Sequence, residues 1–235
     1  IGKEQSLLPA SHLNIALGPL VQTWRIGFAD ARIPNNAEVT HALSLTDPQL
    51  IELDPRSCTV FLAKEGMKLD LGCLAKGYIA DKIADYLKSQ HVMSALINLG
   101  GNIKTIGANV LANRPWQIGI QNPRQPRGTN LAVLPICNQS VVTSGTYERK
   151  LQVNEYTYHH ILDRKTGYPV DTQLASITII SDNSLDGEIW TTRLYGEKPR
   201  QLLARVEQEK GIEVLMVTTD NRVYYSSGIS PEFLA

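Results

Sequence analysis

The clearest pattern of hydrophobic and polar positions lies between residues 74 and 88. Apolar side chains recur there at intervals of three and four, and charged side chains occupy the positions that would face the other side of a helix. The apolar positions are Ile79, Ala80, Ile83, Ala84 and Leu87, and the charged ones are Asp81, Lys82, Asp85 and Lys88. The pattern predicts an amphipathic helix that begins at Leu74.

Short strand-like segments, separated by turn residues, account for most other apolar positions. Before the helix they are "DPQLIELDP", "SCTVFLA" and, after a turn at Glu65-Gly66, "MKLDLG". After it they are "VMSALINL", "NIKTIG", "WQIGIQNP", "LAVLPIC", "VVTSG", "KLQVN", "YTYHHIL", "ASITIIS", "EVLMVTT" and "RVYYSS", with "RQPRGTN" as an exposed connection. Strands joined by such short turns favour a largely antiparallel sheet.

Three further helices are predicted between these strands. They cover residues 37–45, with Asn35 or Asn36 as N-cap, residues 186–196 and residues 199–210. Helices interleaved with hairpins indicate an α+β fold, in which helices flank the antiparallel sheet. Because the sequence has no internal repeat and no low-complexity linker, we expect a single domain over residues 1–235.

The composition argues against several classes of protein. Hydrophobic residues make up 43% and charged residues 20% of the chain, and the formal net charge is +0. This balance disfavours a disordered chain and a partner bound through charge, such as nucleic acid. No apolar run reaches the roughly 18 to 20 residues of a membrane span. Cys58, Cys73 and Cys137 lie far apart, so we expect neither a disulfide framework nor a cysteine metal site.

Two glycine-containing segments could accept a ligand. In "LGCLAKGY" a strand ends at Gly72, and Lys76 lies in the first turn of the next helix, where exposed N–H groups and an ammonium favour a phosphate. In "NLGGN", Gly100 and Gly101 permit positive φ or the close approach of a planar ligand. An ordinary helix start and a simple tight turn explain the same residues without a ligand.

The segment "YTYHHILDRKTGYP" could hold a general base. In a strand over residues 158–162, His159 and His160 point to opposite faces, so only one can face a given pocket. An imidazole accepts a hydroxyl proton near neutral pH, and Asp163 could fix its tautomer. A buried histidine with satisfied ring nitrogens is an equal alternative.

The helix predicted in "SLDGEIWTTRLYG" could hold a divalent cation. Glu188 and Thr192 are four residues apart, so they share one helix face, and a carboxylate with a hydroxyl can bind a hard cation. Asp186 and Thr191 are nearby competitors. Helix capping and the helix dipole explain an acidic residue at this end without a metal.

Together these segments resemble, in order and spacing, the ApbE family of FAD:protein FMN transferases. The similar segments are "DLGCLAKGY", "LINLGGNIKTIG", "PWQIGIQNPR", "TSGTYER" and "YHHILDRKTGYPV". The stretch "LNIALGPLVQTWRIG" looks like the family's early flavin-contacting segment. The resemblance covers residues 13–196 and implies an ApbE-like flavin transferase fold.

The resemblance also implies a reaction and a location. Family members use Mg²⁺, or another divalent cation, to transfer FMN from FAD to a threonine or serine hydroxyl of an acceptor flavoprotein, and they release AMP. It implies an extracytoplasmic, membrane-anchored lipoprotein that meets the membrane only through a lipidated N-terminal segment. We expect that segment, with part of the family's fold, to precede residue 1.

The family motifs further assign roles to individual residues. By similarity, FAD would contact Asn14, Ile15, Ala16, Gly72, Lys76, Tyr78, Gly100, Gly101 and Ile161. The metal would bind the carbonyl of Ala75 and the side chains of Glu188 and Thr192, with Asp186 as the fallback ligand. The family pattern stresses the second histidine, so His160, with Asp163, would be the base and His159 would pack.

Three departures from the family pattern bear on this assignment. "EIWTTRLY" replaces "DALSTALF", so Glu188 is one methylene longer than the usual aspartate. "LDRKTG" replaces "LDPRTG" and loses a turn-fixing proline, and Cys73 stands where a glycine is common. Two other functions stay open: a metal-dependent FAD pyrophosphatase that forms FMN and AMP, and a flavin-binding protein without turnover.

Overall fold

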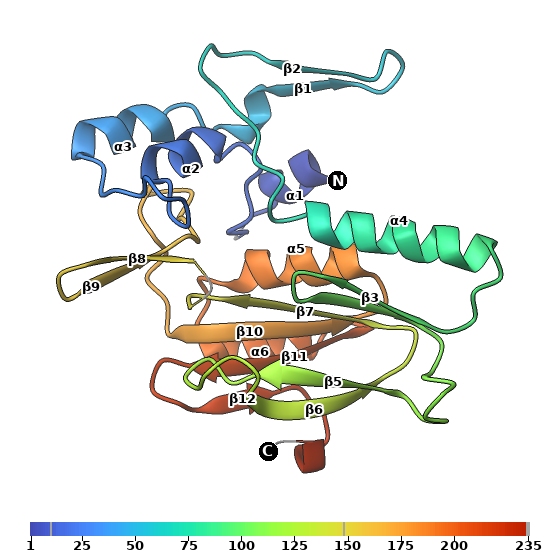
Figure 1. Ribbon diagram of the computed structural model, residues 1–235. Helices are drawn as coiled ribbons and strands as arrows, with labels where there is room; N and C mark the ends of the chain where they lie inside the picture. The colour runs from blue at the N-terminus through green and yellow to red at the C-terminus, as the bar shows by residue number, and fades with distance from the viewer. Residues whose placement is uncertain (10, 148, 234–235) are drawn as a thin grey trace. The chain divides into compact units, whose positions relative to one another are not determined.

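The structure, a computed structural model, describes residues 1–9, 11–147 and 149–233 (Figure 1). The chain forms two compact units, each made of two stretches of sequence. Unit 1 comprises Ile1–Cys73 and Thr146–Asp171, and unit 2 comprises Leu74–Gly145 and Thr172–Ala235. Each unit has a hydrophobic core of its own. The single domain expected from the sequence stays a prediction.

Unit 2 contains a six-stranded sheet with the order β12-β11-β10-β7-β4-β3. Every neighbouring pair is antiparallel, as the short turns predict. The strands are β3 (Ala95–Leu99), β4 (Asn102–Ile106), β7 (Ser140–Gly145), β10 (Leu174–Ser181), β11 (Ile212–Thr218) and β12 (Val223–Tyr225). The hairpin of β5 (Trp116–Gln121) and β6 (Asn130–Ile136) forms a separate two-stranded sheet.

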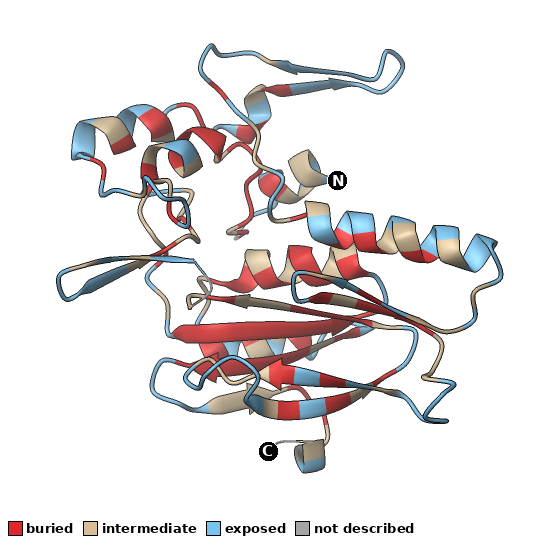
Figure 2. Cartoon of the chain, viewed as in Figure 1, coloured by how far each residue is buried: buried red, intermediate tan, exposed pale blue. Residues whose placement is uncertain are grey.

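The six-stranded sheet is covered on both faces. All eight residues of β10 are buried (Figure 2). On β7, Val141 packs against the core of the β5–β6 hairpin. The next residue, Val142, faces α5 (Ser184–Leu194), because a Cβ added at Gly187 of that helix would lie 2.6 Å from it. Successive valines thus face opposite layers, as the period of a strand requires.

Helices supply the layer opposite the β5–β6 hairpin. α4 (Ala75–Ser89) packs against β4 and α5, and α5 packs against β7 and β10 (Figure 1). α6 (Pro199–Val206) packs against β11, and a short 3₁₀ helix, η2, covers Pro231–Phe233. Among the residues that the structure describes, none of the helices has both the length and the apolar composition of a bilayer-crossing segment.

Unit 1 is built from short helices and two hairpins. Its elements are α1 (Gly2–Leu7), α2 (Gly18–Trp24), α3 (Asn36–Leu43), η1 (Pro48–Leu50), β1 (Ile51–Asp54), β2 (Thr59–Leu62), β8 (Lys150–Val153) and β9 (Tyr156–His159). Leu20 and Trp24 of α2 pack against Val39 of α3 and against Leu162. The indole Nε1 of Trp24 donates a hydrogen bond to the carbonyl of Gly167 at 2.8 Å, so it fixes the turn after β9 to the core.

The start of α3 confirms one of the two predicted caps. The side chain of Asn35 accepts from the N–H of Glu38 at 3.0 Å, and Glu38 accepts in return from the N–H of Asn35 at 2.9 Å. This reciprocal pair is a capping box, which satisfies two amides that the helix leaves without partners. The predicted helix therefore begins at Asn36.

One predicted strand is wrong. "MKLDLG" follows the predicted turn at residues 65–66 but forms no strand. Its neighbour is the segment that runs from the turn at Ile15 into the first residue of α2, Gly18: the N–H of Asp70 donates to the carbonyl of Ile15 at 2.8 Å, and a Cβ at Gly18 would lie 2.6 Å from the carbonyl oxygen of Lys68. A strand needs a regular partner for its ladder of hydrogen bonds, and this neighbour offers none.

Gly167→Ala should destabilise unit 1 more than Gly66→Ala does. Both glycines have positive φ, 76° and 87°, so both substitutions strain the backbone. A Cβ at Gly167 would also lie 2.8 Å from Val39, whereas at Gly66 the nearest atom is the flexible tip of Leu45 at 3.1 Å. We expect the unfolding free energy, measured by urea titration, to differ by roughly 1–3 kcal/mol between the variants. Equal losses of unfolding free energy would show that the surrounding side chains accommodate a Cβ at Gly167.

Candidate functional site

The predicted site residues are divided between the two units. Unit 1 contains Asn14, Ile15, Ala16, Gly72, His160, Ile161 and Asp163, and unit 2 contains Ala75, Lys76, Tyr78, Gly100, Gly101, Asp186, Glu188 and Thr192.

The N-terminus of α5 is fixed by the side chain of Asp81 on α4. Asp81 Oδ1 accepts from the N–H of Ser184 at 2.8 Å, and Oδ2 accepts from the N–H of Leu185 at 2.9 Å. A carboxylate here satisfies two free amides and complements the helix dipole. Gly77 permits the close approach, because a Cβ there would lie 2.5 Å from the carbonyl oxygen of Ser184. Helix packing therefore explains Gly77 without a ligand.

Glu188 places a carboxylate inside this helix pair, where only 3% of the residue is exposed. The ammonium of Lys76 lies 2.7 Å from Glu188 Oε1, and the amide Nδ2 of Asn102 donates to the same oxygen at 2.9 Å. Such partners are needed because an unpaired buried charge costs several kcal/mol. Among the described residues, no hydrogen bond or ion pair holds Oε2. That oxygen can therefore bind a cation.

Thr192 is the hydroxyl that can join Glu188. It lies one turn later on the same helix face and is half-buried. The hydroxyl of Thr191 instead donates to the carbonyl of Glu188 at 3.0 Å, inside the helix. Asp186 lies two residues before Glu188, so it points to another face, and it accepts from the amide of Asn183 at 3.0 Å. The geometry favours Glu188 with Thr192, and the ligand assignment stays a prediction.

These oxygen donors fit a hard divalent cation such as Mg²⁺. No cluster of three or more His, Cys, Asp or Glu side chains suited to a metal occurs within the described part of the chain. An ion beside Glu188 would therefore depend on hydroxyl, backbone and water oxygens, and Mg²⁺ commonly keeps several waters. Ala75 is the first residue of α4, where its carbonyl accepts a helical hydrogen bond and retains a second lone pair.

Gly100 and Gly101 form the two-residue turn between β3 and β4. Their φ angles are 63° and 95°, and Leu99 pairs with Asn102 across the turn. Positive φ at both central positions defines the tight hairpin turn that favours glycine. A Cβ at either residue would meet no atom within 4 Å, so the turn needs glycine for its backbone angles and not for space. Contact with FAD stays a prediction for both.

Tyr78 lies on the outer face of α4, with 48% of the residue exposed. The ammonium of Lys82 lies 5.6 Å from the centre of its ring. An aromatic ring in this position can pack against a planar ligand, and contact of Tyr78 with FAD stays a prediction.

Two of the predicted flavin-contacting segments lie side by side in unit 1. The hydrogen bond from Asp70 to Ile15 joins the segment of residues 14–16 to the segment that ends at Gly72. Asp70 Oδ1 also accepts from the N–H of Gly72 at 2.7 Å. The side chain of Asn14 is buried and donates to the carbonyl of Thr46 at 2.8 Å. The buried side-chain amide of Asn14 therefore stabilises the conformation of residues 14–16.

His159, the last residue of β9, is buried with both ring nitrogens in hydrogen bonds. Nε2 lies 3.0 Å from the carbonyl of Val170, and Nδ1 accepts from the N–H of Ile161 at 3.3 Å. A carbonyl only accepts, so Nε2 carries the proton and the ring is neutral. Burial lowers the pKa of His159 below its ordinary value, and the hydrogen bond to Val170 partly opposes this. His159 thus packs, as the sequence predicts for the first histidine.

His160 follows the end of β9 and is only half-buried. Its Nδ1 lies 3.3 Å from the carbonyl of Arg149. If Nδ1–H donates there, the lone pair lies on Nε2, which is the arrangement of a general base. The role of His160 stays a prediction.

Asp163 organises its own turn. Its Oδ1 accepts from the N–H of Lys165 at 2.6 Å and of Thr166 at 3.0 Å, and its carbonyl accepts from the N–H of Gly167 at 2.8 Å. These hydrogen bonds stabilise the loop after β9. Asp163 therefore has a structural role in addition to its predicted role beside His160. That Asp163 fixes the tautomer of His160 remains a prediction.

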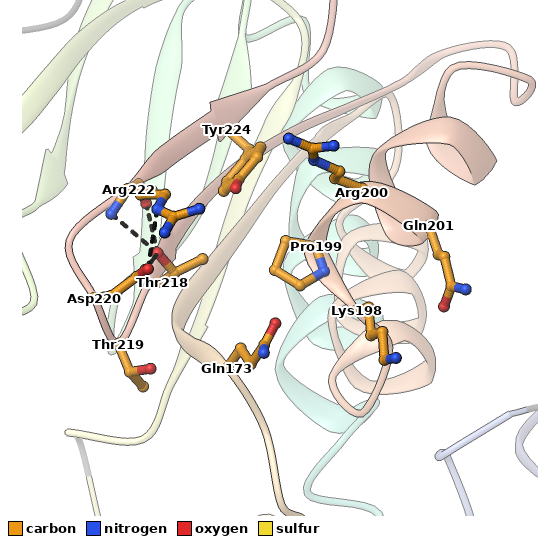
Figure 3. A pocket seen from close by; sticks show the side chains of 10 residues that line it. All are labelled: Gln173, Lys198, Pro199, Arg200, Gln201, Thr218, Thr219, Asp220, Arg222 and Tyr224. Atoms are coloured by element: carbon orange, nitrogen blue, oxygen red, sulfur yellow. Dashed lines mark hydrogen bonds and ion pairs between the residues drawn. The ribbon is translucent and has the colours of Figure 1, made fainter.

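A separate cavity of about 590 Å³ opens in unit 2 beside the start of α6 (Figure 3). Its lining consists of Gln173, Lys198, Pro199, Arg200, Gln201, Thr218, Thr219, Asp220, Arg222 and Tyr224. None of these is a predicted site residue. Arg222 pairs with Asp220 at 3.0 Å, and most of the lining residues are exposed, so we assign no ligand to this cavity.

Two residues of the unit 2 site are absent from the prediction: Asn102 and Asp81. Asn102 stands in the quoted "NLGGN", but its sequence context signals only a turn. Asp81 stands on the charged face of the predicted helix, where it resembles any solvated carboxylate. Their partners lie 86 and 103 residues away along the chain, respectively, so no local pattern could reveal them.

Comparison with known proteins identifies the family. A family model described as the ApbE family matches residues 2–216, so the chain belongs to the ApbE family. A Klebsiella pneumoniae protein named FAD:protein FMN transferase is 46% identical over 225 residues, which cover 96% of this chain and 69% of that protein. A Treponema pallidum protein of the same name is 36% identical over 228 residues, which cover 92% and 63%.

Solved structures show the same fold. An ApbE protein from Thermotoga maritima matches with a TM-score of 0.87 and 27% identity, over 100% of this chain and 75% of that one. The flavin transferase ApbE of Vibrio cholerae matches with a TM-score of 0.77 and 28% identity, over 95% and 71%. The α+β fold with its antiparallel sheet is thereby confirmed.

The burial of His159 predicts a pH-dependent stability. Its folded pKa lies below the ordinary value of 6.5, so above that pH both states are neutral. As the pH falls below about 6.5, the unfolded chain gains a proton that folded His159 does not, and stability is lost until the folded pKa is reached. Unfolding in urea at pH 7.5 and 5.5 should show a smaller loss for His159→Gln than for the wild type. Equal losses would contradict a neutral, buried His159.

Proposed function

We propose that this chain is the catalytic part of an FAD:protein FMN transferase. The observation that carries the proposal is the 46% identity to a protein of that name, over a stretch that includes every predicted site segment. The Glu188 carboxylate, buried beside Lys76 with one oxygen unpaired among the described residues, supports it. The substrate would be FAD, and the acceptor would be a protein that bears a target threonine or serine.

In the proposed reaction, the hydroxyl oxygen of the acceptor forms a bond to the FMN phosphorus while the pyrophosphate P–O bond breaks. The bonding electrons leave with AMP, and the hydroxyl proton passes to Nε2 of His160. A divalent cation bound by Glu188, Thr192 and Ala75 would neutralise charge that develops on the phosphates. Lys76 would add a second positive charge near them.

The proposal is tested by incubating the protein with FAD, Mg²⁺ and an acceptor domain that carries the target residue. Flavin fluorescence on the denatured acceptor in a gel would support transfer. Free FMN without labelled acceptor would identify a pyrophosphatase, and unchanged FAD would identify a binding protein.

His160→Ala should slow transfer by about 10²-fold or more, because a general base contributes on that scale. FAD binding, measured by flavin fluorescence quenching, should change little. His159→Gln serves as the control for the adjacent ring and should retain most of the activity. Full activity in His160→Ala would remove His160 from the mechanism.

Thr192→Val should weaken the response to Mg²⁺, whereas Thr191→Val should not. Both changes replace a hydroxyl by a methyl of similar size, and only the Thr191 hydroxyl is already used inside the helix. We expect the Mg²⁺ concentration for half-maximal transfer to rise at least about tenfold in Thr192→Val and about twofold or less in Thr191→Val. The reverse order would assign the ligand hydroxyl to Thr191.

A further inference from the structure

Asn102 connects three elements of unit 2 at the carboxylate of Glu188. It is the first residue of β4 and only 2% exposed. Its Nδ2 donates to Glu188 Oε1 at 2.9 Å, and its Oδ1 accepts from the hydroxyl of Ser184, the first residue of α5. An ionised carboxylate only accepts hydrogen bonds, so the NH₂ of Asn102 must face Glu188 and its oxygen must face Ser184. The two contacts fix the orientation of the amide.

The second partner of Glu188 is less able to fix its carboxylate. Lys76 reaches Oε1 through a long, flexible side chain and is 47% exposed, so it can follow movements of the carboxylate or turn toward an anion. Asn102 has a short side chain that starts from a strand of the sheet. Asn102 is therefore the contact that fixes the orientation of the Glu188 carboxylate.

The same hydrogen bonds also fix the position of the start of α5. Asp81 holds the N–H of Ser184 at 2.8 Å, and the hydroxyl of Ser184 holds Asn102. One turn of helix after Ser184, Glu188 returns to the same amide. The position of Glu188 along its helix and the orientation of its carboxylate are thus set by one connected network, in which every contact is buried or half-buried.

We propose that Asn102 is a positioning residue for a divalent cation site. By holding Oε1 of Glu188, it leaves Oε2 for a cation, and Thr192 follows one turn later on the same helix face. The identity of the bound ion rests on the proposed function, whereas the effect of Asn102 on Glu188 rests on the contacts above.

The test measures Mn²⁺, as a stand-in for Mg²⁺, by electron paramagnetic resonance, without FAD and without turnover. Asn102→Ala should lower the affinity for Mn²⁺ by roughly 10- to 100-fold, the range for partners that orient a metal ligand. Asn98→Ala is the matched control, since Asn98 lies in the same hairpin and holds the N–H of Gly101 at 2.9 Å without a contact to Glu188. It should retain the wild-type affinity.

Ser184→Ala provides a second variant in case Asn102→Ala folds poorly. It leaves Asn102 in place and removes only the hydroxyl that orients the amide, so a smaller loss, about 2- to 10-fold, is expected. Thermal unfolding verifies that each variant is folded. In the transfer assay, saturating Mg²⁺ should restore the rate of Asn102→Ala to within about threefold of wild type, which general damage to the fold would not allow.

The outcomes separate the two proposals. Equal Mn²⁺ affinity in the wild type and in both variants would overturn the positioning role and leave the transferase proposal intact. Loss of affinity in the variants, with no transfer by the wild type, would support the positioning role and count against the proposed function. A wild-type chain that binds no Mn²⁺ would overturn the positioning role and the predicted metal site together.

Discussion

The arrangement of unit 2 depends on the burial of one carboxylate, that of Glu188. A buried ion is tolerated only when hydrogen-bond donors and an opposite charge surround it, and leaving it unpaired would cost several kcal/mol. Lys76 from α4 and Asn102 from β4 meet this requirement only if both elements lie close to α5. That proximity in turn requires Gly77, because any side chain there would collide with the backbone of Ser184. Lys76, Asn102 and Gly77 look independent in the sequence, but all three are needed for the burial of the Glu188 carboxylate.

Local chemistry allowed much of the fold to be predicted from the sequence. The spacing of Ile79, Ala80 and Leu87 gives the long helix, and Asn35 gives the capped start of α3, because each signal acts within one or two turns. The glycine pair of the β3–β4 turn is equally local. The partners of Asn102 could not be predicted, since they are fixed by the folded sheet, and no spacing rule relates strand β4 to a helix 86 residues away. The sequence could thus point to Glu188 as a candidate ligand on its helix, but not to Asn102, which holds the carboxylate of Glu188 in the fold.

The turn in "LDRKTG" is fixed without the proline that the resemblance to the family would place after Asp163. Asp163 shapes the turn through its own hydrogen bonds, so the backbone does not depend on a fixed φ at the next position. Arg164 gains contacts that proline could not make: its guanidinium donates to the carbonyls of Ser6, Ser11 and Leu13. Burial lowers the pKa of Arg164, but an arginine remains charged at any physiological pH. The turn is thereby fastened to the N-terminal segment that precedes Asn14.

The two histidines differ in burial because of where β9 ends. His159 is the last residue of the strand, and its buried ring, with a lowered pKa, stays neutral near pH 7. His160 lies beyond the strand, so strict alternation no longer decides its direction, and it remains partly accessible. A neutral neighbour matters for a base, because a second positive charge beside it would disfavour the protonated form that proton transfer creates. The burial of His159 therefore leaves a neutral ring beside His160, which suits the general-base role proposed for His160.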